Sequence, residues 1–168
     1  NGKKIRHFNA NLKGGKNSPN EGGNHVPLFF YWKGVLSEGK DINQLTAHID
    51  LYKTFTELAG AKLPGTMQSL KGLSLIPLLE NTVTNWEDRL MFTHCGRWKT
   101  GKVEEAKYTK MAIRSQQWRF VNNKELYDVI NDPGERKNVA SENPEVITKF
   151  KQPYNEWWSS SIPFMINE

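Results

Sequence analysis

The stretch KMAIRSQQWRFVNNKELYDV, residues 110–129, contains short apolar runs separated by pairs of polar residues. The separating pairs, Gln116-Gln117 and Asn122-Asn123, leave room only for tight turns. Short runs joined in this way are typical of an antiparallel meander. We therefore predict neighbouring strands at residues 110–114, 118–121 and 125–129, in a small sheet with one face open to water.

Elements on both sides of this stretch extend the prediction. Residues 89–93 form another short apolar run and predict a fourth strand, and residues 131–134, NDPG, predict a turn. Pro144 can begin a helix, and Pro153, inside it, is expected to kink it or split it in two. Apolar side chains recur along this helix at a spacing that lets them cover the dry face of the sheet, at Val146, Ile147, Phe150, Tyr154, Trp157 and Trp158.

The first half of the chain shows other patterns. Residues 26–32, VPLFFYW, are continuously apolar, which fits a strand covered on both faces in the parallel or mixed sheet of an α/β domain. Apolar residues at helical spacing predict a helix over residues 45–59. Thr46 and Asp50 both offer a side-chain oxygen that can cap its start.

The pattern changes between the two halves. Pro77 limits or begins a short helix near residues 73–79, and the strand-like runs follow. This change predicts a domain boundary at residues 82–86.

Composition excludes several classes of protein. A chain of 168 residues is one domain or pieces of two, too short for a complete large enzyme, and the missing initial Met suggests a piece of a longer chain. No apolar run approaches the length of a membrane helix, and we expect no membrane contact. The 23 basic residues against 18 acidic ones are dispersed, without a recognition helix, so we expect no nucleic-acid partner either. The lone Cys95 rules out an internal disulfide.

A glycine-rich segment carries the first candidate site. Gly14-Gly15-Lys16 and Glu21-Gly22-Gly23 let the backbone approach a ligand closely, and Lys16 offers a compact cation for a tetrahedral anion. The alternative is a flexible loop whose lysine is merely hydrated.

Several sequence blocks resemble formylglycine-dependent sulfatases, in the family's order. The blocks are GGK (14–16), EGG (21–23), VPLFFYWKG (26–34), HIDLYKTFTELAG (48–60), LKGLSLIPLL (70–79), WRFV (118–121), ELYD (125–128), NDPGE (131–135) and NVA (138–140). The resemblance implies an alkaline-phosphatase-like α/β fold, of which this chain is a C-terminal portion. Residues 1–85 would be the incomplete tail of the large α/β domain. Residues 86–168 would be a small α+β subdomain with a four-stranded antiparallel sheet and a covering helix.

The resemblance also implies site residues. Lys16 matches the lysine that binds the substrate's sulfate group, where it would act in catalysis by neutralising charge on the sulfate oxygens. His94 would contact the substrate from the small subdomain, the alternative being a surface-loop histidine. The nucleophile should lie outside the chain, because no C/S-x-P-x-R motif occurs. Cys95 is expected to be a packed residue. His25 stands where the family commonly has Arg, which would make an ion pair there depend on pH.

Partners and cofactor follow from the same resemblance. The expected substrate is a sulfated small molecule or sulfated glycan, and the expected partner is the missing N-terminal part of the sulfatase domain. Ca²⁺ would be bound in the full-length enzyme by ligands outside this chain, with none expected here, and the chain alone should be inactive. The family's usual location is periplasmic, lysosomal or secreted. A non-catalytic module that binds sulfated or acidic polysaccharide, and a related phosphoester hydrolase, remain the alternatives.

Overall fold

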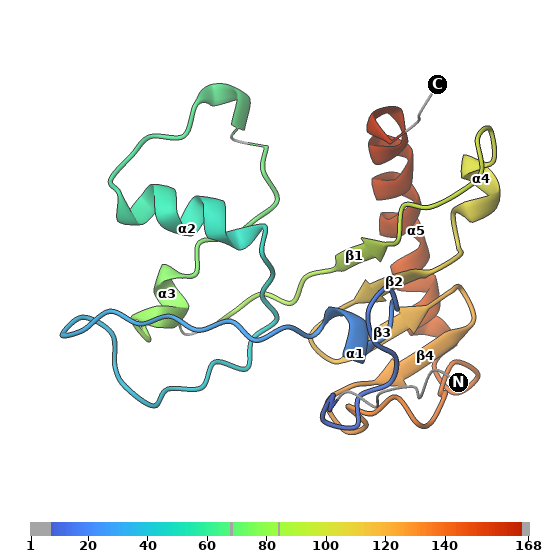
Figure 1. Cartoon of the computed structure of the whole chain (residues 1–168), viewed down its shortest axis with the longest axis horizontal. Helices are drawn as coiled ribbons and strands as arrows, with labels where there is room; N and C mark the ends of the chain where they lie inside the picture. Colours follow the sequence, from blue (N-terminus) through green and yellow to red (C-terminus); the bar gives the residue numbers. More distant parts are fainter. Residues whose placement is uncertain (1–7, 68, 84, 166–168) are drawn as a thin grey trace, which may run out of the picture. The chain divides into compact units, whose positions relative to one another are not determined.

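The chain forms two compact units in the computed structural model, which describes residues 8–67, 69–83 and 85–165 (Figure 1). The sheet unit runs to Pro27 and resumes at Arg89, and the helical unit is Leu28–Asp88. The break at residue 88 lies close to the boundary expected from the sequence. Residues 8–27, however, belong to the same compact unit as the C-terminal sheet. The assignment of residues 1–85 and 86–168 to two sulfatase domains stays a prediction.

An antiparallel meander forms the centre of the sheet unit. Its strands are β1 (Met91–His94), β2 (Met111–Arg114), β3 (Trp118–Val121) and β4 (Glu125–Asp128), hydrogen-bonded in the order β1-β2-β3-β4. The predicted sheet is thereby confirmed. Asn122 and Asn123, with φ of 50° and 56°, are the central residues of the turn between β3 and β4, which the Lys124 N–H closes by donating to the Val121 carbonyl at 3.0 Å. Positive φ at both central residues is what a type I′ turn needs.

Helix α5 (Pro144–Ser161) covers one face of the sheet. Phe150, Tyr154 and Trp158 of α5 are buried against Met111, Ile113, Phe120 and Leu126 of the strands. The helix continues across Pro153, so of the two expected effects, a kink or a split, the split is wrong and the kink stays a prediction. Proline removes one backbone donor, while the apolar contacts on both sides of it hold the helix together. The short helix α4 (Val103–Ala106) lies in the connection between β1 and β2, and η2 (Ile162–Phe164) follows α5.

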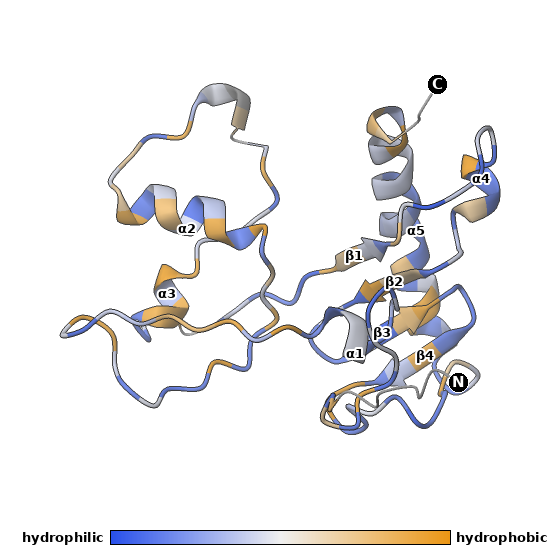
Figure 2. Ribbon diagram, viewed as in Figure 1, coloured by the Kyte–Doolittle hydropathy of each residue, from blue (hydrophilic) through white to orange (hydrophobic). Residues whose placement is uncertain are grey.

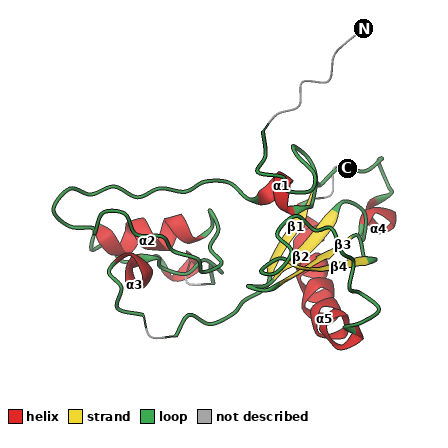
Figure 3. Ribbon diagram, turned by 90° about the horizontal axis from the view of Figure 1, so that it is seen from below, coloured by secondary structure: helices red, strands yellow, loops and turns green. Residues whose placement is uncertain are grey.

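The opposite face of the sheet is also covered, and the predicted wet face is wrong. Ala112, Val121 and Tyr127 on this face are buried. Helix α1 (Glu21–Asn24) and the loop before it lie on this side, and Figure 3 shows α1 and α5 on opposite sides of the sheet. The strands carry apolar residues on both faces, so each face needs a cover.

The helical unit contains little regular structure. Its elements are α2 (Asp50–Leu58), η1 (Gly65–Met67) and α3 (Ile76–Leu79). The strand predicted at residues 26–32 is wrong, because this segment is extended but has no partner strand among the described residues. Phe29 and Tyr31 are 88% and 81% exposed, and Figure 2 shows hydrophobic residues along this open segment. A strand requires a neighbour for its backbone hydrogen bonds, and the described part of this unit contains no other strand.

Helix α2 is held by its polar residues. It begins at Asp50, later than predicted, and Asp50 does not act as an N-cap. Its buried carboxylate accepts backbone N–H groups from Ala47 at 2.7 Å and Leu73 at 2.8 Å. The predicted apolar stripe, by contrast, is largely exposed at Tyr52 and Phe55. The helix therefore has an apolar side that this unit does not cover.

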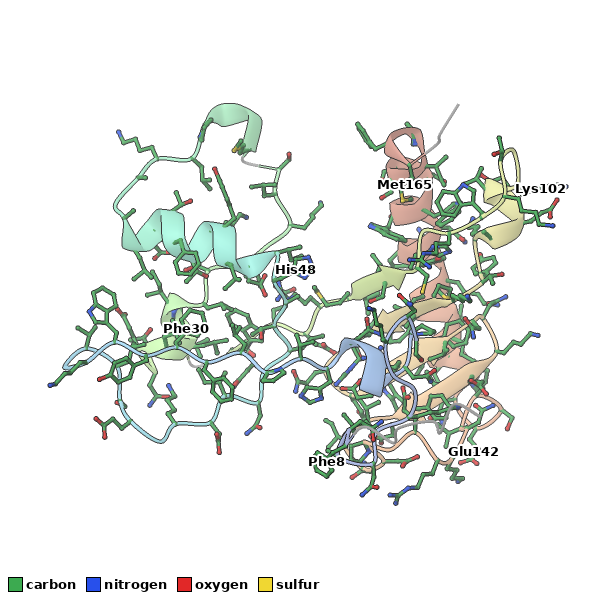
Figure 4. All side chains as sticks on the ribbon, in the orientation of Figure 1. Phe8, Phe30, His48, Lys102, Glu142 and Met165 are labelled. Carbon is green, nitrogen blue, oxygen red and sulfur yellow. The ribbon has the colours of Figure 1, made fainter. Side chains whose placement is uncertain are left out.

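An apolar hollow of the helical unit lies beside that side of α2. Phe55 and Leu58 line it together with Ile76 and Leu79 of α3 and with Phe30, which Figure 4 shows beside α3. Among the described residues, no helix is both long and apolar enough to span a membrane.

Candidate functional site

Lys16 lies at the tip of a closed loop, residues 13–22, which we call the Lys16 loop. The N–H of Gly22 donates to the carbonyl of Lys13 at 2.8 Å and closes the base of the loop. At the tip, the N–H of Ser18 donates to the carbonyl of Gly15 at 2.8 Å, and Asn17 has a φ of 67°. This is the arrangement of a type II turn with Lys16 at its second position. The Lys16 side chain is exposed and makes no hydrogen bond or ion pair with any residue that the structure describes.

The glycines of this segment let the loop pack on itself. A Cβ at Gly23 would lie 2.2 Å from the carbonyl oxygen of Ser18, and one at Gly22 would lie 2.8 Å from that of Lys13. Contacts this short would force the backbone apart. The glycines thus let the backbone approach its own chain closely, and the shape of the loop depends on having no side chain at these positions. The expected approach to a ligand stays a prediction.

A buried ion cluster fixes the loop to the sheet. The Arg119 side chain, on β3, donates from Nε and Nη2 to Glu21 Oε2, at 2.8 and 2.5 Å. Its third nitrogen, Nη1, donates to the carbonyl of Pro19 at 2.7 Å. Glu135 completes the cluster, with Oε1 3.3 Å from Arg119 Nε and Oε2 accepting the Glu21 N–H at 3.1 Å. All three side chains are buried, so these charge-assisted contacts are sheltered from water.

Further charges surround Glu21. Arg114 Nε lies 3.6 Å from Glu21 Oε2, and His25 Nδ1 lies 3.2 Å from Oε1. The contact with His25 is an ion pair only when the imidazole is protonated, as the sequence led us to expect. Burial raises the pKa of Glu135, opposed by the Glu21 N–H bond and the charge of Arg119. Burial therefore makes the ionised form of Glu135 costly, and the hydrogen bond and Arg119 offset that cost only in part.

A second anchor holds the start of the loop. Lys13 Nζ donates to the hydroxyl of Tyr127 at 2.5 Å and lies 3.6 Å from a carboxylate oxygen of Glu125. Burial alone would lower the pKa of Lys13, but the Tyr127 hydrogen bond and the nearby acidic groups outweigh it, and the pKa is raised. The lysine thus stays charged. The Lys16 turn is consequently tied to the sheet on both sides.

His94, the other predicted site residue, already has its hydrogen bonds within the chain. Its Nδ1 accepts the Gly96 N–H at 2.9 Å, which assigns the ring proton to Nε2, and Nε2 lies 2.9 Å from the Ala106 carbonyl oxygen. The ring also packs against Trp98 and Trp158, with centroids 5.7 and 4.9 Å away. Contact with a substrate through a ring nitrogen would require one of these bonds to break. That role stays a prediction.

Cys95 links the loop after β1 to the Lys16 loop. Its Sγ lies 3.4 Å from the carbonyl oxygen of Asn17, which is adjacent to Lys16. The structure therefore brings the segment that contains His94 and Cys95 next to the turn that presents Lys16. Among the described residues, no group of three or more His, Cys, Asp and Glu side chains is arranged to hold a metal ion. The Ca²⁺ ligands of the full-length protein stay a prediction.

Sequence reasoning missed the buried ion cluster. Glu21 was noted only as a neighbour of glycines, and Arg119 only as part of a strand. One signal was available: Arg119 interrupts the apolar residues Trp118, Phe120 and Val121, and an arginine inside a short strand needs a partner if its face is buried. Nothing in the sequence identified that partner, which lies 98 positions away.

Known sulfatases match most of this chain. Residues 17–157 match the family model described as N-sulphoglucosamine sulphohydrolase, C-terminal. The chain belongs to the sulfatase family. Lys16 lies one residue before the matched range. The steryl-sulfatase of Rattus norvegicus is 36% identical over 95 residues, which cover 56% of this chain and 16% of that protein. Arylsulfatase K of the same species is 29% identical over 146 residues, covering 82% of this chain and 25% of that protein.

Solved structures are also similar to most of this chain. The crystal structure of Ps i-CgsB in complex with k-i-k-neocarrahexaose is similar with a TM-score of 0.73 and 30% identity. The similarity covers 88% of this chain and 32% of that one. The sulfatase portion described here thus spans only a minor share of the length of these relatives, and the family model that it matches is a C-terminal one.

Proposed function

We propose that this chain is the C-terminal portion of an enzyme that hydrolyses sulfate esters. Membership of the sulfatase family, over residues 17–157, is the observation that carries the proposal. The nucleophile, which the resemblance implies is a formylglycine, and the Ca²⁺ site would be supplied by the rest of the protein. The chain described here would contribute substrate contacts.

Lys16 is the residue of this chain that we assign to the sulfate group. Its ammonium is exposed on a turn whose two flanks are anchored to the sheet, so the backbone that carries Lys16 is held in place while the ammonium has no competing partner among the described residues. A cation next to the sulfate would stabilise the negative charge that develops on its oxygens as the S–O bond breaks. Because that charge grows in the transition state, the effect should appear in kcat/KM.

A sulfated saccharide is the substrate class that we propose. The similar Ps i-CgsB structure contains a bound hexaose, k-i-k-neocarrahexaose, which supports a saccharide, whereas the steryl-sulfatase match leaves a small sulfated alcohol as the competing class. Lys16 would contact the sulfate group, which both classes share, so the residues that select the alcohol part would lie elsewhere.

Hydrolysis by the whole protein tests the proposal. We expect release of sulfate from sulfated oligosaccharides, with a smaller rate on an aryl sulfate and no matching rate on the corresponding phosphate esters. If sulfate is released only from a small sulfated alcohol, the proposed substrate class is wrong but the proposed reaction stands. Phosphate release without sulfate release would overturn the proposed function.

A further inference from the structure

The buried ion cluster has more contacts with the Lys16 loop than any other group of side chains described above. Arg119 reaches Glu21 through two nitrogens and the carbonyl of Pro19 through the third, and Glu135 accepts the N–H of Glu21. These contacts fall on residues 19–21, directly after the turn that carries Lys16. The C-terminal sheet and the turn after it therefore hold the loop at Pro19 and Glu21, through backbone groups of both residues and the Glu21 carboxylate.

The geometry of the cluster is specific to a guanidinium. Its three nitrogens diverge in one plane, and each has an oxygen partner at 2.8 Å or less. A lysine ammonium at the same position has one nitrogen and cannot reach partners on both Pro19 and Glu21 in this plane. The planar guanidinium thus fixes the directions of its hydrogen bonds to the loop as well as their lengths.

A buried charge cluster is a costly way to join two segments. Apolar side chains of similar volume often stabilise a fold as well or better, so such a cluster is weak evidence for a purely stabilising role. The cluster instead favours one arrangement of the loop on the sheet, because separating a buried carboxylate from its guanidinium costs much free energy.

We propose that Arg119, Glu21 and Glu135 position Lys16, so that the small C-terminal sheet sets the orientation of the sulfate-binding cation. Arg119 acts through the loop and is a positioning residue. This inference rests on the proposed function, and it adds that a strand 103 positions after Lys16 controls the site. Hydrogen exchange in the chain and kinetics in the whole protein test it separately.

The first experiment measures the loop in this chain. Arg119→Lys and Glu21→Gln should increase hydrogen exchange of the amides in residues 13–22 about tenfold or more, as the loss of one or two charge-assisted hydrogen bonds implies. Cys95, the single thiol of the chain, lies against the carbonyl of Asn17 and should react faster with a thiol reagent in both variants. Glu142→Gln, which removes an exposed ion pair with Lys137, is the matched control and should change neither quantity.

Folding must be separated from positioning. Exchange protection of β2 and α5 reports whether each variant retains the sheet and its covering helix, and Glu21→Gln preserves side-chain volume if Arg119→Lys fails to fold. Unchanged exchange in the Lys16 loop of a folded Glu21→Gln variant would overturn the positioning role, whatever the activity of the whole protein.

The second experiment measures kinetics in the whole protein. Arg119→Lys should lower kcat/KM for a sulfate ester, and the double variant Arg119→Lys/Lys16→Ala should be no slower than Lys16→Ala alone, because both changes remove the same interaction. A purely structural role would instead make the two losses multiply, and that result would overturn the inference. Absence of sulfate hydrolysis in the unmodified protein would overturn the proposed function, a failure distinct from both outcomes above.

Discussion

At the scale of single residues, positions without side chains decide the shape of the Lys16 loop. Gly23→Ala should lower the free energy of unfolding of the sheet unit by about 2 to 3 kcal/mol, because its Cβ would overlap the Ser18 carbonyl oxygen. Gly15→Ala is the matched control, since a Cβ there meets nothing within 4 Å, and it should cost less than about 0.5 kcal/mol. Denaturant titration measures both. Equal losses would show that the close contact does not matter.

Tyr154 makes a second prediction at this scale. Its buried hydroxyl donates to the Lys107 carbonyl at 2.5 Å, and burial raises its pKa far above the ordinary value. The folded state therefore keeps the phenol proton above pH 10, while the unfolded state loses it, and stability falls as pH rises beyond 10.

The variant Tyr154→Phe isolates this contribution. It should cost about 1 kcal/mol at neutral pH through the lost hydrogen bond, and it should reduce the loss of stability between pH 10 and 11. Tyr127, whose pKa is also raised, should leave part of the dependence of stability on pH in the variant. Unfolding curves at pH 7, 10 and 11 measure both effects. An unchanged alkaline slope in the variant would contradict the assignment.

At the scale of elements, the turn between β3 and β4 offers a test of backbone conformation. Asn123→Gly should stabilise the chain by about 0.5 to 1 kcal/mol, because Asn-Gly is the preferred pair for a turn with two positive φ angles. Asn122→Gly should not, since Asn122 Oδ1 accepts the Met111 N–H at 3.2 Å and that bond would be lost. Thermal unfolding compares the two. Stabilisation by both changes would show that the Met111 bond contributes nothing.

Local patterns predicted the elements of the sheet unit well and those of the helical unit poorly. The strands of the meander and α5 follow from short-range periodicity and turn chemistry, so the sequence contains their cause. The fate of residues 26–32 and of the apolar side of α2 depends on neighbours that this chain does not provide. Lys16 was predictable as an exposed cation beside glycines. The Arg119–Glu21 contact was not, because it joins segments 98 positions apart.

At the scale of the whole molecule, the two units should differ in stability. Amides of β2 and β3 should exchange slowly, because they pair within a sheet covered on both faces, whereas those of residues 28–36 should exchange within seconds. In the whole protein, residues 28–36 should become protected if they join the sheet that the sulfatase resemblance implies. Hydrogen exchange followed by mass spectrometry measures both states. Slow exchange of residues 28–36 in the chain by itself would contradict this expectation.

The C-terminal portion would matter to a reaction whose nucleophile lies elsewhere, because its sheet holds the loop that carries Lys16. Arg119 lies on one face of the sheet, and α5 packs on the other face. The packing of α5 stabilises the sheet, and the sheet holds the loop through Arg119. The Lys16 loop gains from this a stable position that ten residues could not maintain alone.

Steady-state hydrolysis of a sulfate ester by the whole protein, with Lys16→Ala, Lys16→Arg and Lys149→Ala compared, is the most direct test. Loss of the cation that faces the developing oxyanion should lower kcat/KM about a hundredfold or more for Lys16→Ala. Lys16→Arg should retain part of the rate, and Lys149→Ala, an exposed lysine of α5, should retain all of it. A Lys16→Ala enzyme as fast as the Lys149→Ala enzyme would contradict the account.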